Sequence, residues 1–208
     1  MTLPLTLLHS TQLHCRIFDR LRDRIAPPLR PEHRVRADWL ARGRSDGMTR
    51  QLAAEMRKAV ETAPGRVLCT CTSLGEAADE AGAIRIDRPM MAAAAQSDGP
   101  ILLVCALGSA ASPSRALLQS CLDETGRAPP VTTLVVEEFW PLFEAGQVAN
   151  FCAAVAAAAL EAVQVRPDFR TVVLAQASMA DAAHLLGGLG PDVLTAPELA
   201  LRCALDLA

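Results

Sequence analysis

The chain of 208 residues repeats one pattern in its two halves. The segment "VLCTCTSLGEAA" from Val67 aligns with "VVLAQASMADAA" from Val172, an offset of 105 residues, and most apolar positions pair with apolar positions. Three shorter pairs begin at Leu5 and Leu102, at Val35 and Val135, and at Ile86 and Leu194, with offsets of 97, 100 and 108 residues. Self-similarity at about half the chain length indicates that one structural unit occurs twice.

Within each half, short apolar segments alternate with stretches of helical character. In the first half, strands are expected at 3–8, 34–36 and 66–70, and helices at 12–25, at 48–61 and from Leu74. Alternation of this kind produces right-handed βαβ crossovers and a parallel sheet. The sequence therefore predicts an α/β fold with two pseudo-symmetric halves, each a short parallel sheet flanked by helices.

The expected boundary lies in "SDG", which gives a first half at 1–98 and a second half at 99–208. The C-terminal helix is a candidate to pack back on the first half. In open parallel sheets, ligands bind beyond the carboxyl ends of the strands. An active-site cleft is therefore expected between the two halves.

Composition and charge narrow the class of protein. Seven scattered cysteines indicate reduced thiols in a cytoplasmic protein, and no secretory signal is apparent at the start. The apolar segment 151–165 is shorter than a membrane span and contains Glu161, so it predicts a buried alanine-rich helix. Residues 1–60 carry twelve Lys and Arg against six Asp and Glu, but the chain has no Tyr and few other aromatics, which argues against nucleic-acid binding.

Cys71 is the candidate catalytic residue. It follows the third expected strand and precedes the S-x-x-E pattern formed by Ser73 and Glu76, which is typical of a helix N-cap. The positive end of a helix lowers the pKa of a thiol and favours the reactive thiolate. The alternative is that Cys71 is a small buried hydrophobe, as is expected of Cys69 within the strand. No metal site is expected, because C-x-C is tighter than the usual zinc spacing and no second pair completes four ligands.

The segments "VLCTCTSLGE", "IDRPMMAAA", "ASPSRALL" and "VVLAQASMADAA" resemble the aspartate/glutamate/hydantoin racemase superfamily over almost the whole chain. The resemblance implies two α/β halves around one cleft, no cofactor, and a cysteine from each half on opposite faces of the substrate α-carbon. Cys71 matches the first of these cysteines, whereas the second position is Gln176, which cannot usefully accept a proton near pH 7. A simple two-thiol racemase is therefore not expected.

Seven residues are candidates for substrate binding: Thr72, Ser73, His9, Ser10, Ser112, Gln176 and Ser178. Ser112 resembles the family position whose hydroxyl and amides hold the substrate carboxylate, with an ordinary helix N-cap before Pro113 as the alternative. Ser178 is also interpreted as a cap, because an acidic residue follows three positions later. His9 and Ser10 end the first strand, where a lone histidine is commonly structural.

The sequence thus predicts a cofactor-independent isomerase that acts through Cys71 at the α-carbon of a small carboxylate or amino acid. Alternatives are a single-thiol decarboxylase or cis-trans isomerase of the same fold, a non-catalytic descendant that binds a small carboxylate, and an unrelated metabolite-binding α/β domain. The expected partner is the small-molecule substrate, with no nucleic acid and no membrane. The family resemblance also makes a homo-oligomer an expectation.

Overall fold

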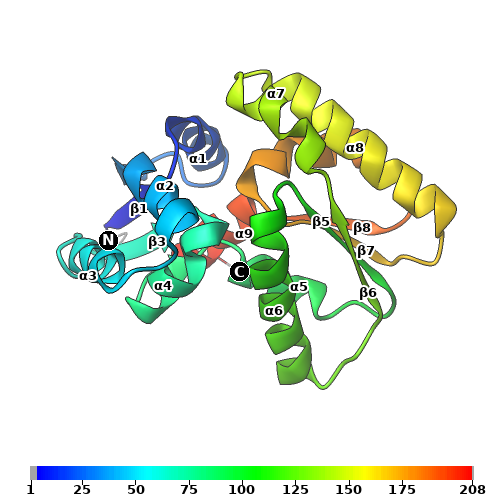
Figure 1. The fold of residues 1–208 in the computed structure, drawn as a ribbon, viewed down its shortest axis with the longest axis horizontal. Helices are drawn as coiled ribbons and strands as arrows, with labels where there is room; N and C mark the ends of the chain where they lie inside the picture. The colour runs from blue at the N-terminus through cyan, green and yellow to red at the C-terminus, as the bar shows by residue number, and fades with distance from the viewer. Residues whose placement is uncertain (1–3, 208) are drawn as a thin grey trace. The chain divides into compact units, whose positions relative to one another are not determined.

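A computed structural model describes residues 4–207 and contains two four-stranded parallel sheets (Figure 1). The strand order is β2-β1-β3-β4 in the first sheet and β6-β5-β7-β8 in the second, so both sheets have the same topology. The predicted α/β fold with two similar halves is confirmed.

The first unit comprises residues 4–88 and 197–207. Its elements are β1 (Leu5–His9), α1 (Gln12–Ile25), β2 (Glu32–Val35), α2 (Ala37–Asp46), α3 (Arg50–Glu61), β3 (Arg66–Cys69), the 3₁₀ turn η1 (Thr72–Leu74), α4 (Gly75–Glu80), β4 (Ile84–Arg85) and most of α9 (Ala196–Ala204). The helix α2 has no counterpart among the sequence-based expectations. It carries the buried Trp39, which packs into the core of this unit.

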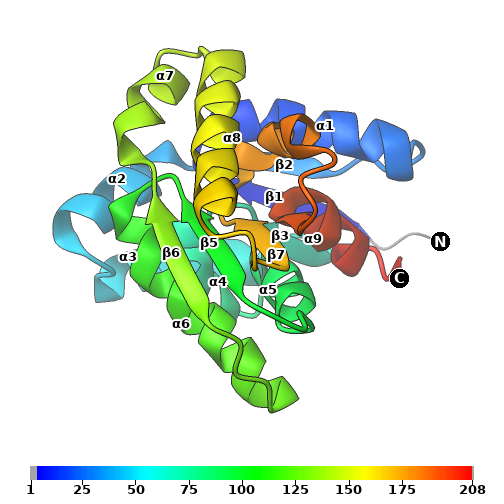
Figure 2. The same ribbon diagram turned by 90° about the vertical axis from the view of Figure 1, so that its right-hand side faces the viewer.

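The second unit comprises residues 89–196. Its elements are α5 (Arg88–Ala94), β5 (Ile101–Cys105), α6 (Gly108–Thr125), β6 (Val131–Val135), η2 (Glu137–Phe139), α7 (Trp140–Glu144), α8 (Val148–Val165), β7 (Thr171–Leu174), η3 (Ala177–Leu186) and β8 (Asp192–Thr195). Figure 2 shows the strands of this sheet between α6 and α8. That arrangement follows from two right-handed crossovers that run in opposite directions across the sheet, from β5 through α6 to β6 and from β6 through α8 to β7.

The hydrogen bonds of the two sheets fix which residues are equivalent. The Arg36 N–H donates to the His9 carbonyl at 2.7 Å, and the Val136 N–H donates to the Cys105 carbonyl at 2.9 Å. His9 is therefore equivalent to Cys105, and the offset at the first strand is 96 residues rather than the predicted 97. A slip of one residue exchanges the two faces of a strand, so this correction decides which side chains correspond.

The last strand and helix of each half correct another offset. Ile84 pairs with β3 as Leu194 pairs with β7, so the strands are offset by 110 residues rather than 108. Pro89 and Pro197 nevertheless both occupy the second position of the following helix, which keeps the offset of 108 residues there. The two offsets differ because two residues connect β4 to α5, whereas α9 follows β8 directly.

The last helix of each half of the sequence belongs to the other unit. From Pro89 onward α5 groups with the second unit, where the Thr125 hydroxyl donates to the Ala95 carbonyl at 3.4 Å. From Pro197 onward α9 groups with the first unit, where Arg66 donates to the Ala204 carbonyl at 3.0 Å. The division therefore falls at 88/89 and 196/197, whereas the sequence suggested a single boundary near residue 98.

The apolar segment near 151–165 lies in α8. This helix is the one described helix that is long and apolar enough to cross a membrane by length and composition. One stripe of it, including Phe151, Val155 and Ala159, is buried in the second unit. The buried stripe accounts for much of its apolar composition, while the opposite face is exposed.

Candidate functional site

The candidate site in the first unit lies at the carboxyl ends of β1 and β3. Successive side chains of an extended strand point to opposite faces of the sheet. His9 and Thr70 lie together on the face covered by α1, with the His9 Nδ1 2.8 Å from the Thr70 hydroxyl. Ser10 and Cys71 follow them, and the Ser10 hydroxyl forms a hydrogen bond to the Cys71 sulfur. Two residues of the predicted site are thus brought together.

Hydrogen-bond donors converge on the Cys71 sulfur. The Ser10 hydroxyl and the backbone N–H groups of Leu74 and Ser73 interact with it, and the Arg44 guanidinium adds a positive charge. These groups favour the thiolate, yet burial of the side chain is the larger effect and raises the pKa of Cys71. The lowered pKa expected from the helix start is therefore wrong for this structure, in which the thiol is protonated at neutral pH.

The predicted cap at Ser73 is also wrong. Cys71 itself occupies the N-cap position of η1, and Leu74 precedes α4 without a side-chain cap. Ser73 lies within η1 and is exposed, so its hydroxyl is not used as a cap, whereas the neighbouring Thr72 is buried. The alternative interpretation of Cys71 retains support, because its side chain belongs to the apolar core cluster of this unit.

His9 is held from both sides within the first unit. Its Nδ1 lies 2.8 Å from the Thr70 hydroxyl, and its Nε2 lies 2.9 Å from the Nδ1 of His33. Burial, together with the nearby His14 and His33, lowers the pKa of His9 to about 3. Both ring nitrogens are thus occupied in this structure, and the ring is neutral near pH 7. His9 remains a predicted substrate contact that no observation here supports.

In the second unit, Gln176 occupies the position equivalent to Cys71. Each follows its strand by two residues and provides the extended N-cap residue of a 3₁₀ segment, η1 or η3. The Gln176 Oε1 accepts a hydrogen bond from the Ala106 N–H at 2.6 Å, while its buried Nε2 has no hydrogen-bond partner within residues 4–207. Ala106 is the counterpart of Ser10. The amide side chain therefore binds the backbone where Cys71 interacts with a hydroxyl.

Cys105 is a second buried thiol close to Gln176. Burial raises the pKa of Cys105 to about 11, although the nearby polar side chains of Ser114 and Gln176 partly oppose the rise. The Ser114 hydroxyl makes no hydrogen bond to nitrogen or oxygen in the part of the chain that the structure describes. Cys105 ends β5 at the position of His9, so it does not replace the missing thiol at position 176.

Ser112 does not cap a helix. The helix α6 begins at Gly108, five residues earlier than predicted, so Ser112 and Pro113 lie inside it and Ser112 is exposed. The carboxylate of Glu137 accepts a hydrogen bond from the Gly108 N–H at 3.1 Å. An acidic side chain of the protein therefore contacts the helix start at which the resemblance implies a substrate carboxylate.

Ser178 is not a cap either, because Gln176 occupies that position before η3. Its side chain is buried, and its hydroxyl has no hydrogen-bond partner among the described residues. Ser178 and the Gln176 amide are thus neighbouring polar groups with unused hydrogen-bonding capacity. The predicted arrangement of Cys71 and Gln176 across one cleft stays a prediction.

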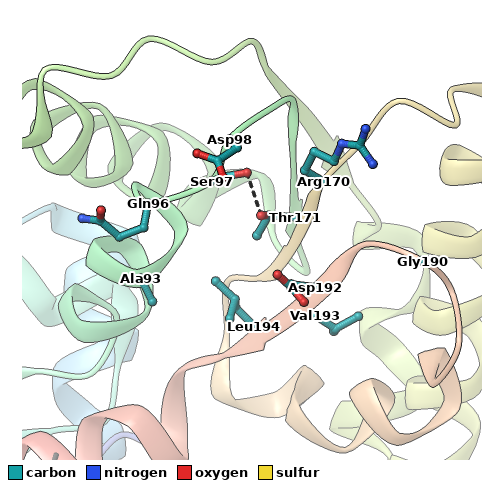
Figure 3. Close-up of a pocket in the computed structure, with 10 residues that line it drawn as sticks. All are labelled: Ala93, Gln96, Ser97, Asp98, Arg170, Thr171, Gly190, Asp192, Val193 and Leu194. Carbon is teal, nitrogen blue, oxygen red and sulfur yellow. Dashed lines mark hydrogen bonds between the residues drawn. The ribbon is translucent and has the colours of Figure 1, made fainter.

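A pocket of about 540 Å³ lies elsewhere in the second unit (Figure 3). It is lined near the amino ends of β7 and β8 by residues including Asp98, Arg170, Thr171 and Asp192, and the Thr171 hydroxyl donates to Ser97 at 2.8 Å. Gln176 follows the opposite end of β7. Ligands of open parallel sheets bind beyond the carboxyl ends of the strands, so this pocket is not the candidate active site.

A group of side chains that the sequence did not single out surrounds His9. Cys15 and Asp19 on α1 and His33 on β2 join it on the same face of the first sheet. The four positions form no recognisable motif, because they are spread from residue 9 to residue 33. Only the pairing of β1 with β2 and the packing of α1 bring them together.

Comparison with known proteins supplies structural neighbours. No protein-family model matches the chain, and no curated protein matches its sequence. Glutamate racemase from Francisella tularensis in complex with D-glutamate superposes with a TM-score of 0.71 at 10% identity, covering 99% of this chain and 80% of that chain. The chain has the fold of the glutamate racemases.

Two further structures extend the range of activities found on this fold. An aspartate racemase homologue from Pyrococcus horikoshii has a TM-score of 0.63 at 13% identity and covers 98% of both chains. A variant of arylmalonate decarboxylase in a sulfate-associated form has a TM-score of 0.57 at 14% identity, covering 98% of this chain and 92% of that chain. The neighbours therefore include racemases and a decarboxylase, and what this chain shares with them is the fold.

Proposed function

We propose that the protein is a cofactor-independent enzyme that transfers a proton at the α-carbon of a small carboxylate or amino acid through Cys71. The observation that carries this proposal is the set of donors around the thiol: the Ser10 hydroxyl and two backbone N–H groups stabilise a negative charge on the sulfur. A core cysteine needs no such donors. The fold shared with racemases supports the same class of reaction.

The equivalent position in the second unit limits the reaction. Inversion of an α-carbon needs a base on one face and an acid on the other. Gln176 bears an amide, which donates hydrogen bonds but does not exchange a proton usefully near neutral pH. We therefore propose that Cys71 works as the single thiol, removing and returning the α-proton on one face, so that exchange with solvent is faster than racemisation.

A second candidate is decarboxylation of a malonate-type dicarboxylate. In that reaction, the bond between the α-carbon and one carboxylate breaks, carbon dioxide leaves with the carboxylate carbon, and the electron pair remains on the α-carbon. A protonated thiol then supplies the one proton that the product needs. The raised pKa of Cys71 favours this role, because the thiol is the form present at neutral pH.

The test uses the full chain in deuterated water with a panel of small amino acids, hydroxy acids and malonates. Proton transfer predicts deuterium at the α-carbon of one enantiomer, or deuterium in a decarboxylated product, and loss of either signal in Cys71→Ser. Cys69→Ala is the matched control, because this buried thiol lies two residues away inside β3. Deuterium incorporation that survives in Cys71→Ser contradicts the proposal.

Gln176→Cys tests the role of the second position. The variant loses the hydrogen bond to the Ala106 N–H but gains a titratable thiol at the position equivalent to Cys71. Racemisation should therefore rise relative to Gln176→Ala, which loses the same hydrogen bond and gains no thiol. If the wild type racemises readily and Gln176→Cys adds nothing, another group supplies the second proton.

A further inference from the structure

The helix α1 brings a cysteine against two histidines of the first sheet. His9 ends β1, and His33 lies in β2 in register with Leu7, so the two rings share one face of the sheet. The His9 Nε2 and the His33 Nδ1 are 2.9 Å apart. One nitrogen of each ring and the sulfur of Cys15 all lie within 4.8 Å of one another. Two imidazoles and a thiol are the donor set that suits zinc and copper.

The far nitrogen of each ring faces an oxygen. The Thr70 hydroxyl donates to the Leu8 carbonyl at 3.2 Å, so its oxygen accepts from the His9 Nδ1–H at 2.8 Å. This leaves a lone pair on the His9 Nε2, which faces the cluster. The His33 Nε2 is buried and makes no hydrogen bond among the described residues, but it lies 3.4 Å from the carboxylate of Asp19, one turn after Cys15 in α1. Histidines that bind metals usually donate their other N–H to such an oxygen, which orients the ring.

We propose that His9, Cys15 and His33 bind a zinc ion, with water as the fourth ligand. Zinc–nitrogen bonds of about 2.0–2.1 Å in a tetrahedral site separate two nitrogens by about 3.3 Å, so the rings need to part by only about 0.4 Å. On binding, the Cys15 proton leaves to solvent. His33 changes tautomer, so that its proton moves from the Nδ1 to the Nε2. The Nε2–H then donates a hydrogen bond to the Asp19 carboxylate.

The site is reachable from solvent. The side chains of His33 and Asp19 are 21% and 44% exposed, whereas His9 and Cys15 are buried. The buried donors provide a site shielded from water, and the exposed edge at His33 provides a path for the ion. A metal site needs both features to form in a folded protein.

The second unit shows that the fold alone does not produce this cluster. Strand register makes Thr133 the counterpart of His33, and the helix N-caps Thr11 and Leu107 make Ala111 the counterpart of Cys15. Two of the three metal ligands are thus absent from the repeat. The donor set belongs to the first unit, and this proposal does not depend on the reaction proposed for Cys71.

The experiment is a titration of the full chain, stripped of metal with a chelator, with Co²⁺ and then with Zn²⁺. Wild-type protein should show a thiolate-to-cobalt charge-transfer band and the strong visible bands of tetrahedral cobalt, both abolished by Zn²⁺. Cys15→Ser should lose the charge-transfer band. Asp19→Asn, at a partly exposed position that leaves the core intact, should weaken binding about 10- to 100-fold.

Two cysteine variants are matched controls, because cobalt can bind other thiols. Cys71→Ser and Cys203→Ser should both keep the band, the first removing the candidate catalytic thiol and the second the exposed thiol of α9. Absence of the band in wild-type protein would overturn the proposal and leave the histidine pair as a hydrogen bond within the core. A band that persists in Cys15→Ser, or disappears in Cys71→Ser, overturns it as well.

Discussion

Removal of the Asp87 charge should destabilise the first unit strongly. Asp87 is fully buried and accepts hydrogen bonds from the Nε and Nη2 of Arg85 at 2.7 and 2.9 Å, and the Arg85 side chain is only 8% exposed. In Asp87→Asn, the shape of the side chain is kept but the buried guanidinium loses its charged partner. Breaking a buried pair in this way costs about 3–5 kcal/mol.

The surroundings of Arg85 set where in this range the cost falls. The carboxylates of Asp79 and Glu76 also attract the guanidinium and partly compensate the lost charge, which favours the lower end. The guanidinium also packs closely against Gly75, because a β-carbon built there would lie 3.2 Å from two of its nitrogens. At about 2–4 °C per kcal/mol for a chain of this size, the midpoint of thermal unfolding should fall by about 6–20 °C.

Circular dichroism of thermal unfolding measures the effect against two references. Asp168→Asn removes a carboxylate that is 57% exposed from its pair with Arg166, and should cost about 1 kcal/mol or less. The double variant Arg85→Met with Asp87→Leu removes both charges and should recover most of the loss. The reasoning is refuted if Asp87→Asn costs no more than Asp168→Asn, or if the double variant is less stable than Asp87→Asn.

Three further predictions concern single residues. Iodoacetamide should label the exposed Cys203 before Cys71 near pH 7, since burial raises the pKa of Cys71. The rate of Cys71 labelling should increase as the pH rises past 9.0, the ordinary thiol value, and should fall in Ser10→Ala. Labelling of Cys71 before Cys203 would contradict the raised pKa. Gln176→Ala should lower the free energy of unfolding in urea by about 1–3 kcal/mol, because the Ala106 N–H loses its acceptor. Gln176→Glu keeps an acceptor oxygen and should lose less, so equal losses in the two variants would refute this explanation. Gly65→Ala should cost at least about 1–3 kcal/mol, because φ is 73° and the new β-carbon would lie 2.0 Å from a backbone oxygen; unchanged stability would show that this turn relaxes.

The repeat in the sequence predicted the fold because apolar periodicity is set by burial in a parallel sheet. It located Cys71 and Gln176 at equivalent positions for the same reason, since both follow a buried strand by two residues. It did not locate the caps. Ser73 and Ser178 match a capping pattern, but each strand is followed by a 3₁₀ segment, η1 or η3, in which Cys71 or Gln176 takes the cap position. Only η1 leads into an α-helix.

The pKa of Cys71 and the cluster around His9 could not be predicted from the sequence for a different reason. A helix start favours the thiolate, but the size of the opposing burial effect depends on how closely the core packs around the sulfur. The contacts of His9 with His33 and Cys15 depend on the register of β1 and β2 and on the rotation of α1. Residue spacing along the chain contains neither quantity.

The grouping of α5 with the second unit and of α9 with the first affects the order in which the units can fold during synthesis. The second unit is one continuous segment, 89–196, so all of its elements are synthesised before residues 197–207. The first unit begins earlier but is completed only by residues 197–207, which are synthesised after the whole of the second unit. Domains usually fold in order from the amino terminus during translation. Here every element of the later unit is synthesised before α9, so the first unit still lacks its last helix when the second unit is complete.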